Sequence, residues 1–103
     1  MMKLLIVTCL RENEHTVKQI FKEAGISIFS IMQSRGIKNE PDLNLLDDWF
    51  GNSDGEADSL VLFSFHQSVS VNKCITLINE SNSKLNIDFP IRAFALPVES
   101  FSN

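Results

Sequence analysis

The sequence has no apolar run long enough to cross a membrane, and it has no basic stripe. Its 103 residues carry nine Lys and Arg against thirteen Asp and Glu, which gives a formal net charge of −4. A membrane-spanning helix needs about 20 consecutive apolar residues. Nucleic-acid binding depends on cations that neutralise phosphates. We therefore expect neither a membrane span nor a nucleic-acid partner, and the length indicates one domain.

Motifs for catalysis and metal binding are also missing. Cys9, Cys74, His15 and His66 include no Cys-x-x-Cys or His-x-x-x-His pair of the kind found in zinc sites. The chain has no nucleophile elbow, phosphate-binding loop or dinucleotide fingerprint. The sequence thus predicts no catalytic residues and no metal ligands, and a protein that acts by binding rather than as an enzyme. With no secretion signal, we expect reduced cysteines and a cytoplasmic location.

Acidic residues are concentrated in one segment, 39–58. It holds seven of the thirteen carboxylates, no Lys or Arg, and the only Trp. Long segments between regular elements of a compact domain are usually functional or disordered, so residues 37–58 are predicted to form an extended acidic loop, with a short helix or turn over 43–50. Two large aromatic residues in such a loop either fold back onto the domain or anchor a partner. The candidate partner-binding residues are Leu46, Asp47, Asp48, Trp49 and Phe50.

Two similar patterns of strand and helix flank this segment. Apolar and β-branched runs at 3–10, 26–35, 59–66 and 89–96 predict strands. Helical spacing predicts one amphipathic helix between an N-cap at Asn13 and a C-cap at Gly25, and a second that begins at Ser68 or Ser70. Residues 79–88 are predicted to be a polar connection. The buried helix positions are Val17, Ile20, Phe21 and Ala24, then Val71, Cys74, Ile75 and Ile78.

The resulting order, β-α-β-loop-β-α-β, predicts an α+β ferredoxin-like fold. Its four-stranded antiparallel sheet has both helices on one face. The predicted strands are apolar on both sides, whereas a helix-free face open to water is normally polar. An exposed face of this kind is larger than the apolar patches of monomers. We therefore expect the helix-free face to pack against other copies in a closed symmetric oligomer.

Two short stretches resemble a known family. The stretch Arg92-Ala-Phe-Ala-Leu-Pro-Val-Glu99 resembles the last core strand of the PII signal-transduction proteins. Before it, the first helix ends in Ala-Gly-Ile, and Arg35-Gly36-Ile37-Lys38 precedes the acidic segment, at the place where that family keeps its long T-loop. The chain is therefore similar to a divergent PII-like protein, with residues 1–103 as a single PII-like domain.

The resemblance implies a homotrimer that controls a transporter or enzyme through its T-loop, as in nitrogen regulation. It also implies a small ligand between subunits, with Arg92 at a phosphate contact and Gly36 beside the site. The charges of Arg35, Lys38 and Arg92 suit an anionic metabolite in the same cleft. The family's glycine-rich phosphate turn is replaced by a stretch, 86–91, that has no glycine and includes Pro90, which has no N–H to donate. The sequence therefore does not predict ATP binding in the family manner, and the candidate ligands are an adenine nucleotide or another anionic metabolite. Alternatively, the three cations pair with the acidic segment.

A second family of related fold offers a competing resemblance. The CutA divalent-cation-tolerance proteins also form trimers of ferredoxin-like subunits. That resemblance implies a role in the response to divalent metals, with Cys9 as the first candidate ligand.

Overall fold

The chain folds in the predicted order of strands and helices. This computed structural model describes residues 1–37, 56–85 and 89–102. The elements are β1 (Met2–Leu10), the 3-10 turn η1 (Arg11–Asn13), α1 (Glu14–Ala24), β2 (Ser30–Ile37), β3 (Glu56–Gln67), α3 (Ser68–Leu85) and β4 (Arg92–Pro97).

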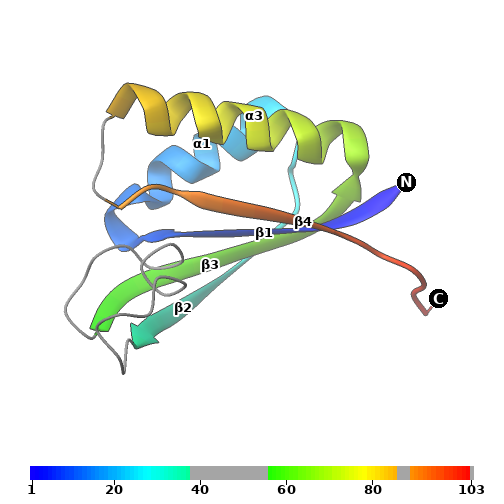
Figure 1. Cartoon of the computed structure of the whole chain (residues 1–103). Helices are drawn as coiled ribbons and strands as arrows, with labels where there is room; N and C mark the ends of the chain where they lie inside the picture. Colours follow the sequence, from blue (N-terminus) through cyan, green and yellow to red (C-terminus); the bar gives the residue numbers. More distant parts are fainter. Residues whose placement is uncertain (38–55, 86–88, 103) are drawn as a thin grey trace.

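The four strands form one antiparallel sheet in the order β2-β3-β1-β4. Both helices lie on the same face of this sheet (Figure 1). Strand β1 is central and pairs with β3 and β4, so the two βαβ-type halves interlock. The predicted ferredoxin-like α+β fold is thereby confirmed.

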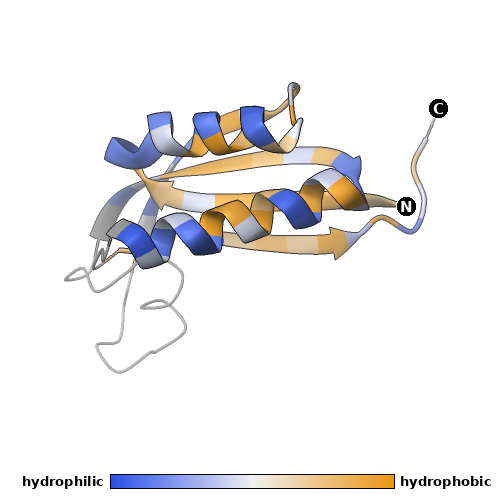
Figure 2. Cartoon of the chain, turned by 90° about the horizontal axis from the view of Figure 1, so that it is seen from above, coloured by the Kyte–Doolittle hydropathy of each residue, from blue (hydrophilic) through white to orange (hydrophobic). Residues whose placement is uncertain are grey.

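The core lies between the sheet and the two helices. Viewed from above in Figure 2, the strands under the helices are largely hydrophobic. The hydrophilic residues lie mostly on the helices (Figure 2). The Phe21 ring packs edge-to-face on Phe29, with centroids 4.9 Å apart. The largest fully buried side chains are Leu5, Val7, Val17, Phe21, Ile26, Leu62, Val71, Ile78 and Ile91. The two predicted helix faces therefore supply much of the core.

Helix α1 ends as the sequence predicts. Gly25 has φ 83°, its N–H donates to Lys22 O at 3.2 Å, and the Ile26 N–H donates to Phe21 O at 2.8 Å. These two bonds satisfy carbonyls that a helix end otherwise leaves unpaired. At the other end Asn13 is the N-cap residue but makes no side-chain cap bond, because η1 leads directly into the helix.

Strand β2 begins later than the predicted range 26–35, so the start of that prediction was wrong. The Ile26 amide closes α1, and its side chain is buried in the core. Pairing with β3 begins only at Ser30, opposite Phe63. Between these points the chain is tied to β3 by a side chain, because Ser64 Oγ donates to Ile28 O at 2.8 Å.

Both ends of the predicted loop, 37 and 58, lie within strands, so these bounds were wrong. Strand β2 continues through Ile37 and β3 begins at Glu56, because these two residues are paired across the two strands. The prediction of a short helix or turn over 43–50 lies outside the described residues.

The prediction of a polar connection over 79–88 was wrong in its first part, since α3 continues to Leu85. The Asn82 side chain explains the late start of β4. Its Oδ1 accepts from Ile91 N–H at 3.0 Å and its Nδ2 donates to Ile91 O at 2.8 Å. Ile91 thus pairs with a helix side chain rather than with a strand, and β4 begins at Arg92 instead of at residue 89.

Candidate functional site

Three of the four residues that the sequence singles out for ligand binding lie at one end of the sheet. Arg35 and Gly36 are near the end of β2, and Arg92 is the first residue of β4. Since β3 and β1 lie between these strands, Arg35 and Arg92 are at opposite edges of the sheet. Lys38 lies outside the described residues.

The two arginines also face opposite sides of the sheet. Arg35 stands opposite Asp58 on β3. Asp58 is two residues before the buried Leu60, so strand alternation turns both Asp58 and Arg35 toward the helix side. Arg92 precedes Ala93, whose partner Val7 faces the helices, so strand alternation turns Arg92 toward the helix-free side. A single subunit therefore does not bring the two guanidinium groups together.

Arg35 has a carboxylate directly opposite it. Asp58 is the last acidic residue of the segment 39–58, and both it and Arg35 are exposed. Side chains directly opposite each other on antiparallel strands have Cβ atoms about 5 Å apart, and opposite charges there attract weakly. The alternative interpretation, in which the cations pair with the acidic segment, is compatible with this register.

Arg92 is placed by the two hydrogen bonds between Asn82 and Ile91. They join the last turns of α3 to the residue directly before β4, and both are partly buried. Together they reproduce the paired N–H and C=O bonds of a strand neighbour. Asn82 was not predicted as a site residue, and its signal in the sequence is an amide side chain near the end of a helix.

The two cysteines are core residues. Cys9 is 5% exposed and Cys74 is 0% exposed, and both are free thiols. Burial raises the pKa of Cys9 to about 11, with a contribution from the charge of Glu14, and raises the pKa of Cys74 to about 12. Metal binding needs the thiolate. Among the described residues no group of three or more His, Cys, Asp and Glu could hold a metal ion.

The helix-free face of the sheet is apolar, as the strand patterns predict. Met32 is 50% exposed, Phe65 55%, Phe94 39% and Leu96 43%. On β1 and β3 the side chains of this face alternate with buried core residues. Met32 on β2 and Phe94 and Leu96 on β4 share the same face, because they stand opposite Val61, Ile6 and Leu4. The partly exposed members of this face are Leu4, Ile6, Val61 and Phe63.

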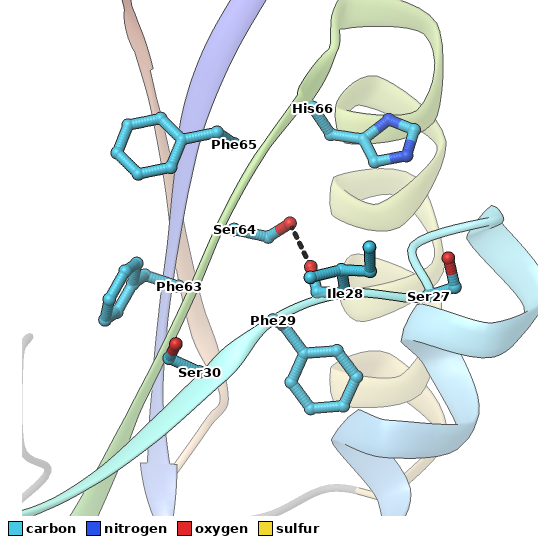
Figure 3. Close-up of a pocket in the computed structure, with 8 residues that line it drawn as sticks. All are labelled: Ser27, Ile28, Phe29, Ser30, Phe63, Ser64, Phe65 and His66. Carbon is cyan, nitrogen blue, oxygen red and sulfur yellow. Dashed lines mark hydrogen bonds between the residues drawn. The ribbon is translucent and has the colours of Figure 1, made fainter. Parts of the chain in front are cut away.

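A surface pocket of about 290 Å³ lies where β2 separates from β3. Figure 3 shows the segment 27–30 on one side of the pocket and the last residues of strand β3 on the other. The Ser64–Ile28 hydrogen bond joins them. Sequence reasoning missed this pocket because it exists only where β2 fails to pair. Its lining residues are Ser27, Ile28, Phe29, Ser30, Phe63, Ser64, Phe65 and His66.

The predicted partner-binding residues all lie outside the described part of the chain. They are Leu46, Asp47, Asp48, Trp49 and Phe50. No helix within the described ranges is long and apolar enough to span a membrane.

No protein-family model and no curated protein matches the sequence. Solved structures do match in fold. A DUF3240 family protein from Shewanella baltica is 14% identical with a TM-score of 0.66, and the match covers 99% of this chain and 94% of that chain. The nitrogen regulatory PII-like protein CPII from Thiomonas intermedia is 11% identical with a TM-score of 0.65, over the same shares of the two chains. PII from Arabidopsis thaliana is 16% identical with a TM-score of 0.65, over 94% of this chain and 77% of that one. The chain therefore has the ferredoxin-like fold of the PII and PII-like signalling proteins.

Proposed function

We propose that this chain is a PII-like regulatory protein. It forms a homotrimer in the cytoplasm, binds a small anionic ligand between subunits, and controls a partner protein through the segment 37–58. The supporting observation is the full-length match in fold to PII-like proteins, one of which was solved with ADP, AMP and bicarbonate and another with citrate. The proposed role is one of binding and not of catalysis.

The helix-free face supports the trimer. Apolar surface is worth roughly 25 cal/mol per Å² when it is removed from water, so the exposed Phe65, Phe94 and Leu96 favour association. Closed rings form when one surface of a subunit meets a different surface of the next. In such a ring the β2 edge of one subunit lies beside the β4 edge of its neighbour.

This arrangement would place Arg35 and Arg92 at the same subunit boundary, Arg35 on the helix side and Arg92 on the helix-free side of the adjoining sheets. Arg35 stands at the β2 edge and Arg92 at the β4 edge, at the same end of the sheet. Two guanidinium groups on either side of a subunit boundary suit phosphate or carboxylate, which they hold by paired N–H donors. A ligand there competes with the acidic segment for the same cations and shifts the position of that segment.

Calorimetric titration of the purified full chain with ADP, AMP, bicarbonate and citrate tests the proposal. We expect one of these anions to bind, and Arg92→Gln to weaken that binding about tenfold or more, since a hydrogen bond to a charged group contributes about 1.5–3 kcal/mol. Lys73→Gln is the matched control, because Lys73 is an exposed cation near the start of α3. Binding of none of the four anions, or equal losses in both variants, contradicts the proposed ligand site.

A further inference from the structure

The last part of β3 has one unpaired edge. Its pairing with β2 ends at Phe63, opposite Ser30, whereas its pairing with β1 continues to Gln67. In the described part of the chain, residues 64–67 therefore have a strand neighbour on one side only. Such an edge offers backbone N–H and C=O groups to another extended segment.

The pocket lies along this unpaired edge and combines apolar walls with polar groups. Phe63 and Phe65 stand on one side of β3, and the segment 27–30 on the other (Figure 3). His66 Nδ1 accepts a hydrogen bond from Gln67 N–H at 2.9 Å. Because Nδ1 accepts this bond, Nε2 is the ring nitrogen that can donate to a neighbouring acceptor. An occupant should have an aromatic or aliphatic side chain on an extended backbone, with acceptors beside it.

The residues after β4 have these properties. Val98 N–H donates to Met2 O at 3.3 Å, and beyond it the chain runs outward from the sheet (Figure 1). Phe101 is 68% exposed in this segment. Glu99 is two residues before Phe101, so in an extended chain their side chains point to the same side. We call residues 98–102 the C-terminal tail.

We propose that the C-terminal tail of one copy adds to the unpaired edge of β3 in the neighbouring copy, with Phe101 in the pocket. This inference rests on the proposed trimer. The tail of each subunit then binds the pocket of the next subunit around the ring, and its own pocket binds the tail of the subunit before it.

The neighbour's pocket is favoured over the chain's own. The tail leaves from β4, and β1 and β3 separate β4 from the pocket. Met1 closes the end of β3 in the same chain, because its terminal amine donates to Gln67 Oε1 at 3.1 Å and its carbonyl accepts from Ser68 N–H at 2.9 Å. A return of the tail would have to reverse direction and pass this contact. In a ring where the β4 edge meets the next β2 edge, the tail points toward the next pocket directly.

Disulfide trapping tests the contact in the full chain. The double variant Ile28→Cys/Phe101→Cys is oxidised and compared with Glu80→Cys/Phe101→Cys. Ile28 lines the pocket and is 84% exposed, and Glu80 is exposed on α3. The native Cys9 and Cys74 are buried and remain in both variants. We expect the first variant to give covalent dimers and trimers on a non-reducing gel, and the second to give none above the background of the single variants.

Each outcome decides the proposal. A disulfide within one chain, seen as a monomer band with both cysteines oxidised, overturns it in favour of the chain's own pocket. Covalent multimers in both variants, or in neither, also overturn it. The trimer is checked separately by the native mass of the unmodified protein. A trimer without trapping refutes only the tail contact, whereas a monomeric protein refutes the proposed function as well.

A second variant avoids any effect of the introduced cysteines. Phe101→Ser should weaken association of the full chain by about tenfold or more, as for a buried aromatic anchor. Ser102→Ala is the control in the same tail. Equal association of Phe101→Ser and wild type contradicts the inference.

Discussion

Gly25 shows how one residue sets the end of an element. Its φ of 83° is a left-handed conformation, and a Cβ there would meet only Ser70 Oγ at 3.7 Å, an ordinary contact. The cost of a side chain is therefore conformational rather than steric. We expect Gly25→Ala to lower the free energy of unfolding by about 1 kcal/mol, and Gly25→Asn to lower it less. Urea unfolding measures both, and equal stability of Gly25→Ala and wild type would contradict the assigned backbone strain.

The two buried thiols predict a dependence of stability on alkaline pH. Burial raises the pKa of Cys74 to about 12 from an ordinary value of 9.0. The native state therefore keeps a proton that the unfolded chain loses. The stability that the protonated thiol contributes is fully present below pH 9. It is lost as the pH rises toward the pKa of Cys74 in the folded state, about 12. Urea unfolding between pH 8 and pH 10.5 should show a smaller loss of stability in Cys74→Ala than in wild type. If the free energy of unfolding fell equally with pH in both proteins, the raised pKa of Cys74 would be contradicted.

At the scale of elements, the kinds and the order of the strands and helices could be predicted from the sequence, but several of their ends could not. Hydrophobic periodicity is local, so it identified both helix faces and the apolar strands. The starts of β2 and β4 depend on individual hydrogen bonds, which hydrophobic periodicity does not record. The Ile26 amide closes α1, and Ile91 pairs with the Asn82 side chain. The pocket follows from the late start of β2, and for that reason no sequence pattern indicated it.

Asn82 is the clearest test at this scale. Its two hydrogen bonds to Ile91 each contribute about 0.5–1.5 kcal/mol. Asn82→Ala should therefore lower the free energy of unfolding by about 1–3 kcal/mol. Asn79→Ala is the matched control, since Asn79 is an exposed asparagine in the same helix. Because Ile91 precedes Arg92, Asn82→Ala should also weaken anion binding in the calorimetric titration. Equal stability of the two variants would show that the Asn82–Ile91 hydrogen bonds do not stabilise the fold.

At the scale of the whole molecule, the helix-free face predicts how subunits associate. Phe94 is 39% exposed on this face, at a central position of β4. Placing a charge there leaves the helix-side core intact but opposes burial against another copy. We expect Phe94→Asp to convert the oligomer into a folded monomer, seen by light scattering and circular dichroism. Val69→Asp is the control, because Val69 is 81% exposed at the start of α3. An unchanged oligomer in Phe94→Asp would place the contact elsewhere.

The native mass of the full chain, measured with and without the four anions, tests the central claim most directly. We expect a particle of three 11.6 kDa chains that gains mass with at least one of ADP, AMP, bicarbonate and citrate. We also expect Arg92→Gln to form the same particle without the added mass. A particle of one chain that binds none of these anions would contradict both the trimer and the ligand site.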